Sequence, residues 1–215
     1  MSDNNECAQF PMDESCSFFD RVMAQLALAE GTEIARRYLA MNAFDGVLPV
    51  LGIIMGGLIS LNFQDPLLIY ETSILSIFAT CFAMFVSGIT SSYLTEGAER
   101  KRDIEELEKS LLSRLDGSAI ARASKTTTVV VSLINGLSPF FSGLATAIPL
   151  ILVVAGLAID LAFVLSVISG MIILFALGLF LGKVSRTNVF VYGIKTLAAG
   201  IVVVIMIWIF SSITG

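Results

Sequence analysis

The stretch NAFDGVLP, residues 42–49, places a carboxylate, a glycine and a proline inside an apolar run. In a helix, Pro49 has no N–H to donate to the carbonyl of Asp45, which lies one turn earlier. Gly46 would let a neighbouring backbone approach closely. The stretch therefore predicts part of a cation site, made of one carboxylate and one freed backbone oxygen at an interrupted helix.

The stretch INGLSP, residues 134–139, repeats this order with a carboxamide in place of the carboxylate. Pro139 deprives the carbonyl of Asn135 of its helical donor, and Gly136 lies between them. We predict that Asp45, Asn135 and the two freed carbonyls together form an intramembrane metal site.

The composition is that of a membrane protein. Hydrophobic residues make up 56% of the 215 residues and charged residues 14%, whereas soluble domains carry about 25% charge. A helix needs about 20 apolar residues to cross a hydrocarbon core of about 30 Å. Suitable runs occur at 38–61, 67–92, 128–154, 161–182 and 194–213. The predicted fold class is an all-α membrane protein with five transmembrane helices.

The length of the first span decides how deep Asp45 lies. A span that began after Gly46 would measure only about 22 Å at 1.5 Å per residue, so the helix must start near Tyr38. Asp45 is then about 10 Å inside the cytosolic end. An ionisable group at that depth costs several kcal/mol unless it faces protein, water or an ion. The alternative interpretation is that Asp45 caps a helix whose preceding residues lie flat on the membrane surface.

Basic residues fall on one side of these spans. All 13 Lys and Arg lie before the first span, between the second and third, or around the connection from the fourth to the fifth. The positive-inside rule then predicts a multi-pass protein with a cytosolic N-terminus and an external C-terminus. The expected location is the cell membrane in a prokaryote and a vacuolar-type membrane in a eukaryote.

Polar segments divide the chain into four parts. We predict a cytosolic N-terminal segment with an amphipathic helix, two spans, a cytosolic acidic helix with a linker, and three further spans, at 1–37, 38–92, 93–127 and 128–215. The acidic helix should run to about Leu115 and stop at Asp116-Gly117. The spacing of apolar residues on this helix predicts a leucine seam that would pair with the same helix of a second copy. The seam consists of Ile104, Leu107, Leu111 and Leu115.

Carboxylates gather on this cytosolic helix. Five of them are candidate metal ligands: Glu96, Glu99, Glu105, Glu106 and Glu108. Because Arg100, Lys101 and Arg102 are interleaved with them, the alternative is a solvated helix face held by salt bridges.

The residue types also exclude whole classes of function. Histidine is absent, which removes the usual zinc ligand and the commonest general base. Carboxylate, carbonyl, amide and sulfur donors suit Mn²⁺ and Fe²⁺. The sequence has no GxSxG, P-loop or HExxH motif, so we predict neither an enzyme nor a prosthetic group. A net charge of −5 argues against nucleic acid as a partner.

Four stretches carry a family resemblance: RRYLAMNAFDGVLPVLGIIMGG, SGITSSYLTEGAER, SPFFSGLATAIPLI and GLFLGKVSR. In this order they resemble the vacuolar iron transporter and CCC1-like family of iron/manganese transporters. The resemblance implies a five-span homodimer that exports Fe²⁺ or Mn²⁺ in exchange for protons, through a path at the dimer interface lined by the first span. Asp45 matches the pathway carboxylate, and Glu96 and Glu99 match the start of the glutamate-bearing cytosolic helix.

Two departures from the family pattern concern possible ligands. The family brings a methionine to the path shortly before the Tyr-Leu pair of the second span, where this chain has Gly88. Met84, one turn earlier, is the candidate replacement. The family's cytosolic domain also has two more helices after the first. The segment of this chain before residue 128 is not expected to form them.

The function expected from the sequence is therefore export of a divalent transition metal, Fe²⁺ or Mn²⁺, by a homodimer embedded in membrane lipid. The alternative is a dimeric membrane scaffold or regulator that does not transport and acts through its cytosolic helix.

The distribution of basic residues generates a test of topology. A reporter fused after Gly215 should appear outside the cytosol, and one inserted near Gly117 should appear inside, when each is assayed by protease protection. A cytosolic C-terminus would require an even number of spans and would contradict the assignment.

Overall fold

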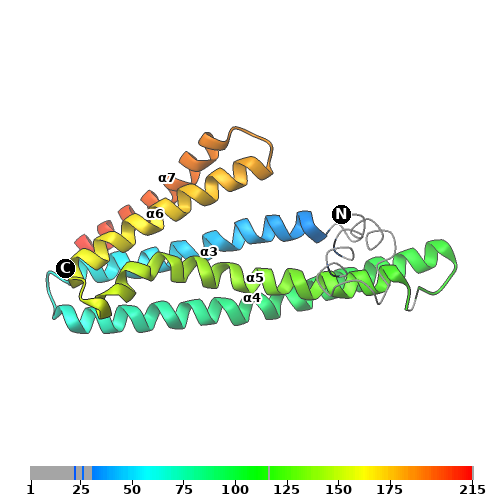
Figure 1. Ribbon diagram of the computed structural model, residues 1–215, viewed down its shortest axis with the longest axis horizontal. Helices are drawn as coiled ribbons and strands as arrows, with labels where there is room; N and C mark the ends of the chain where they lie inside the picture. Colours follow the sequence, from blue (N-terminus) through cyan, green and yellow to red (C-terminus); the bar gives the residue numbers. More distant parts are fainter. Residues whose placement is uncertain (1–21, 23–25, 27–30, 116, 215) are drawn as a thin grey trace, which may run out of the picture. The chain divides into compact units, whose positions relative to one another are not determined.

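Five long helices make up the described part of the protein (Figure 1). The computed structural model describes residues 22, 26, 31–115 and 117–214. In chain order the elements are α3 (Gly31–Ser60), α4 (Pro66–Leu111), α5 (Ala119–Ile151), the 3₁₀ helix η1 (Leu152–Ala155), α6 (Ile159–Val184) and α7 (Val189–Thr214). No strand occurs among these residues, so the predicted all-α class is confirmed for this part of the chain.

Each of the five helices is long and apolar enough to cross a membrane. The candidate spans are Ile34–Ser60, Pro66–Leu111, Ala119–Ala155, Ile159–Val184 and Val189–Ile213. Each overlaps one of the runs predicted from the sequence. The prediction of five apolar helices of spanning length is confirmed, and their sidedness stays a prediction.

The chain divides into two compact units, which are described separately. The first unit combines Met1–Tyr38 with Gly88–Asn135, and the second combines Leu39–Ser87 with Gly136–Gly215. The second unit thus holds most of α3, the first part of α4, the end of α5, and all of α6 and α7.

An apolar core joins α3, α4, α5 and α6 in the second unit. Its fully buried side chains include Val50, Ile54, Ile77, Leu150 and Phe163. The outer surfaces of these helices are also apolar, with large exposed side chains throughout. Between helices that lie in lipid, close van der Waals packing replaces removal from water as the source of stability.

Glycines bring α6 and α7 together as an antiparallel pair in the second unit (Figure 1). A Cβ atom on Gly178 would lie 2.7 Å from the Cα of Gly193, and one on Gly182 would lie 2.7 Å from the Cα of Val189. Such distances are shorter than real Cβ atoms show. Only glycine at these two positions permits the observed approach of the backbones.

α4 and α5 form a helical hairpin in the first unit. The end of α4 and the start of α5 both differ from the prediction. α4 ends at Leu111 rather than near Leu115, because Leu112 has a φ of 51° and cannot continue the helix. α5 then begins at Ala119, where the Ser118 hydroxyl accepts a hydrogen bond from the N–H of Ala121 at 3.2 Å. Much of the predicted linker up to residue 127 is therefore helix.

The predicted leucine seam is wrong as a single helical face. Leu115 lies beyond the end of α4. Ile104 and Leu107 line a groove together with Ile120 and Ala123 of the chain's own α5. These two residues of the predicted seam therefore face α5 of the same chain rather than a second copy.

Most of the predicted N-terminal part, residues 1–37, lies outside the described residues. Val22 and Leu26 are helical, and Leu26 is buried. α3 already begins at Gly31, so the predicted boundary between residues 37 and 38 falls inside a helix.

Candidate functional site

Asp45 lies within α3 and its side chain is exposed. The helix runs without interruption from Gly31 to Ser60, so the interpretation of Asp45 as a helix cap is wrong. Among the described residues, the carboxylate has no hydrogen-bond or ion-pair partner. A single carboxylate therefore projects from the wall of an apolar helix in the second unit.

Asp45 belongs to a stripe on α3, here called the open face. Its members recur at helical spacing along one side of the helix: Met41, Asp45, Pro49, Gly52 and Gly56. The first three are exposed. A Cβ on Gly56 would meet no atom within 4 Å, and one on Gly52 would meet only the Ile207 side chain at 3.4 Å. The described chain leaves most of this face uncovered.

Met41 is a possible ligand that the sequence reasoning missed. It lies one helical turn before Asp45 and its side chain is 56% exposed. Its spacing of four residues from a carboxylate in a helix is the signal that could have identified it. A thioether beside a carboxylate favours a transition metal over Mg²⁺ or Ca²⁺.

The opposite face of α3 is fixed to α5 by two serine hydroxyls. Ser138 donates a hydrogen bond to the carbonyl of Leu39 at 2.6 Å, and Ser142 donates to the carbonyl of Ala43 at 2.8 Å. Gly46 lies at the same crossing, where a Cβ would collide with the Pro139 carbonyl oxygen and the Ser142 hydroxyl. These contacts decide which face of α3 is buried, and thereby leave Asp45 on the other.

The two prolines do not interrupt their helices. Pro49 lies inside α3, and Pro139 lies inside α5, which continues to Ile151. The prediction of interrupted helices is therefore wrong. Each ring still lacks an N–H, so the carbonyls of Asp45 and Asn135 lose their intrahelical donor. Pro49 is exposed next to the carboxylate, whereas Pro139 is buried at the crossing.

Asn135 belongs to the first unit and Asp45 to the second. The Nδ2 of Asn135 donates to the carbonyl of Gly88 at 2.9 Å, which ties α5 to α4. Its Oδ1 is buried and has no partner among the described residues. Gly136 is also buried. Asn135 therefore has a structural role that the sequence did not suggest, and a shared site with Asp45 stays a prediction.

Met84 packs against the apolar core of the second unit and is partly buried there. This contact accounts for its presence in α4 without a metal. Its predicted role as a ligand stays untested.

The acidic helix does not present its glutamates as one group. Glu96 is buried, while Glu99, Glu105 and Glu106 are exposed. Two exposed pairs, Lys101–Glu105 at 4.0 Å and Arg102–Glu106 at 3.0 Å, form i,i+4 salt bridges. The salt-bridged face that the sequence offered as an alternative is present.

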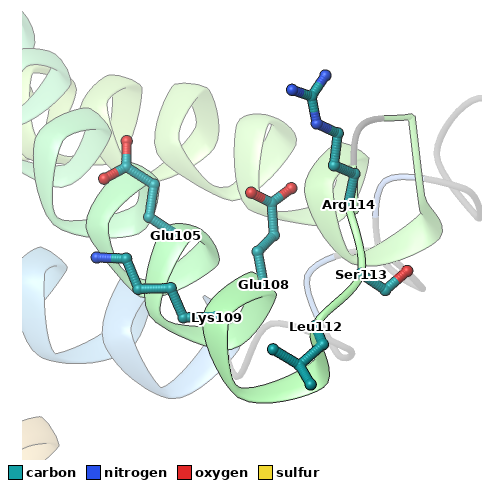
Figure 2. Close-up of a pocket in the computed structure, with 6 residues that line it drawn as sticks. All are labelled: Glu105, Glu108, Lys109, Leu112, Ser113 and Arg114. Carbon is teal, nitrogen blue, oxygen red and sulfur yellow. The ribbon is translucent and has the colours of Figure 1, made fainter.

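Glu108 stabilises the end of α4. Its Oε1 accepts a hydrogen bond from the N–H of Leu115 at 2.7 Å. Figure 2 shows Glu105 and Glu108 on the last turns of the helix, before Leu112 and Ser113. Within the described ranges, no three His, Cys, Asp or Glu residues are grouped so that they could hold a metal ion.

The five apolar helices define an all-α protein of the multi-pass membrane class. The chain is similar to the uncharacterized protein MJ0645 of Methanocaldococcus jannaschii, with 29% identity over 177 residues, which cover 81% of this chain and 87% of that protein. A scan against protein-family models gives no match. No solved structure matches the chain.

The crossing of α3 and α5 generates a test of how the site is positioned. Gly46→Ala should lower the melting temperature in detergent, with a loss of about 1–3 kcal/mol from overpacking against the α5 backbone. Gly97→Ala is the matched control, because a Cβ there would meet only the Thr128 methyl group at 3.8 Å. The control should be neutral or stabilising by up to about 1 kcal/mol. Equal melting temperatures for the two variants would refute the close crossing.

Proposed function

We propose that this protein is a transporter that moves Fe²⁺ or Mn²⁺ out of the cytosol in exchange for protons. The metal would pass along the open face of α3. One observation carries the proposal: an unpartnered carboxylate, Asp45, projects from a helix of spanning length among exposed apolar side chains. A carboxylate in that setting costs several kcal/mol unless water, protein or an ion covers it.

A second copy of the chain is the simplest cover for the open face. Gly52 and Gly56 continue this face beyond Asp45 and would let another helix approach closely. Two facing copies would bring two carboxylates and two Met41 thioethers toward one axis. A homodimer would thus complete a site of which one chain holds half.

The donor types support a transition metal as the substrate. Oxygen from Asp45 and sulfur from Met41 form a mixed set, and the chain contains no histidine. Thioether sulfur binds soft or borderline ions better than it binds Mg²⁺ or Ca²⁺, while carboxylates suit Mn²⁺ and Fe²⁺. The exposed glutamates of α4 would raise the local concentration of cations at the cytosolic end.

Neutralising the carboxylate tests the proposal. Asp45→Asn is nearly isosteric, so the protein should fold, but flux of Mn²⁺ or Fe²⁺ into proteoliposomes should fall more than about tenfold, equivalent to about 1.4 kcal/mol of lost ion stabilisation. A metal-sensitive dye inside the vesicles would report the flux.

Asp65→Asn is the matched control for this substitution. Asp65 lies in the turn before α4, where its carboxylate accepts a hydrogen bond from the N–H of Leu67 at 3.2 Å. The control should transport normally. Full flux in Asp45→Asn would remove Asp45 from the path, and no flux in the native protein would refute transport of these metals.

The exposed glutamates generate a second, weaker effect. Changing the exposed Glu99, Glu105 and Glu106 to Gln should raise the apparent KM about two- to threefold and leave the maximal flux largely intact, because exposed charges are screened beyond about 8 Å. Initial rates over a range of metal concentrations would measure both constants. A complete loss of flux in a folded variant would make the cluster an obligatory binding step.

A further inference from the structure

Basic side chains gather around the connection between α6 and α7 in the second unit, and no acidic side chain accompanies them. From Leu161 to Gly215 the sequence contains neither Asp nor Glu, and its basic residues are Lys183, Arg186 and Lys195. The last carboxylate before them, Asp160, is in the first turn of α6, about 35 Å from Lys183 along the helix. The three basic residues are here called the basic cluster.

All three side chains of the basic cluster are exposed, and none has a carboxylate partner among the described residues. Two exposed basic residues of α4 differ in this respect. Lys101 and Arg102 each form a salt bridge with a glutamate one turn later, at 4.0 and 3.0 Å. The basic cluster is therefore a surface of uncompensated positive charge, whereas these two cations of α4 are offset by their neighbours.

A Schellman motif fixes the backbone at the end of α6. The N–H of Thr187 donates to the carbonyl of Gly182 at 3.1 Å, and the N–H of Arg186 donates to that of Lys183 at 3.3 Å. Arg186 occupies the left-handed position of the motif, with a φ of 52°. Glycine is the usual residue there, because it has no Cβ. The chain thus keeps a cation where the backbone favours glycine.

Lys195 lies within an apolar helix rather than in the turn. It is six residues into α7, about 9 Å from the start of the helix, and its neighbours Val191 and Ile194 are 44% and 62% exposed. An ammonium group among lipid chains is unfavourable, so a lysine at this depth extends its apolar stem toward the polar surface. Its Nζ lies 5.3 Å from the centre of the Tyr192 ring, three residues nearer the turn. The charge is therefore directed toward the start of α7.

A glycine of α6 allows Tyr192 to pack against the helix pair. A Cβ on Gly182 would lie 3.3 Å from the Cβ of Tyr192 and 2.7 Å from the Cα of Val189. The Thr196 hydroxyl also donates a hydrogen bond to the carbonyl of Leu174 at 2.9 Å, which ties α7 to α6. The cluster is thus carried by a closely packed helix pair, and little backbone freedom would be lost when it binds a ligand.

We propose that the basic cluster binds the headgroup of an anionic phospholipid. Arginine and lysine side chains donate charge-assisted hydrogen bonds to phosphate oxygens. The acyl chains would lie along exposed apolar side chains of the same two helices, which are Val184, Phe190 and Ile194. Basic side chains at the polar ends of spanning helices attract anionic lipids. Lipid binding of this kind does not depend on the transport of a metal.

Sidedness alone does not explain the arrangement. The positive-inside rule accounts for basic residues in a connection on one side of a membrane, and Lys183 and Arg186 need no other reason. It does not require a lysine inside the following helix, placed beside an aromatic ring and flanked by exposed apolar side chains. A headgroup phosphate accounts for all three cations, because it supplies the negative charge that the described chain lacks there.

A lipid titration of the purified full chain in a nonionic detergent tests the proposal. Phosphatidylglycerol or phosphatidylcholine would be added, and native mass spectrometry would count the lipids retained per chain. The native chain should retain phosphatidylglycerol at about tenfold lower concentration than phosphatidylcholine, because only the former carries net negative charge. Changing Lys183, Arg186 and Lys195 together to Gln should abolish this preference. Equal retention of the two lipids by the native chain would overturn the proposal.

The matched control changes Lys101, Arg102 and Lys109 to Gln, which removes the same charge from exposed positions of α4. This control should prefer phosphatidylglycerol as the native chain does. An equal loss of preference in both triple variants would reduce the effect to net charge and would overturn the site.

Lys195 separates a defined headgroup site from a diffuse positive surface. Lys195→Gln should weaken retention of phosphatidylglycerol about three- to fivefold, whereas Lys195→Arg should bind like the native chain, because arginine keeps the charge and also stacks on aromatic rings. Native retention in Lys195→Gln would overturn the assignment. Inorganic phosphate in excess should not displace the lipid, because it has no acyl chains. Displacement by inorganic phosphate would assign the cluster to a free anion and would likewise overturn the proposal.

Discussion

An unpaired carboxylate on the outer surface of an apolar helix is the constraint on which the second unit depends. In a soluble protein an exposed aspartate needs no explanation, because water solvates it. On a helix of spanning length the same exposure directs the charge toward lipid unless a polar partner covers it. The described residues leave the surface of α3 that carries Asp45 uncovered, and its glycines would allow close contact with another helix.

The crossing of α3 and α5 determines which side of α3 remains open. Two serine hydroxyls one turn apart on α5 bond to carbonyls one turn apart on α3. Such bonds add a polar attachment to a junction otherwise made by packing, and Gly46 lets the backbones meet. Rotating α3 about its axis to bury Asp45 would break both hydrogen bonds. The position of the carboxylate is thus a consequence of small residues on the opposite face.

The helices were predictable from the sequence because long apolar runs can satisfy their backbone groups in a membrane only as helices. Their ends were less predictable. The end of α4 depends on the left-handed backbone of Leu112 and on the bond from Leu115 to Glu108, and neither has a signal in the composition. The metal-ligand role of Asp45 was inferred from residue type and depth, and it stays a prediction. Which helix face it occupies could not be inferred, because serines almost 100 residues away decide it.

Charge balance, rather than the number of carboxylates, distinguishes the candidate ion sites of the two units. Seven of the 18 acidic residues are on α4, yet those that are exposed are screened, and two of them form salt bridges with neighbouring basic residues. Glu96 is shielded from water but paired with Arg100, which leaves little net field for a divalent ion. Asp45 is a single charge without a basic neighbour in the described chain, in surroundings of low dielectric constant where its field is strongest. On charge balance alone, a divalent cation would gain most at Asp45.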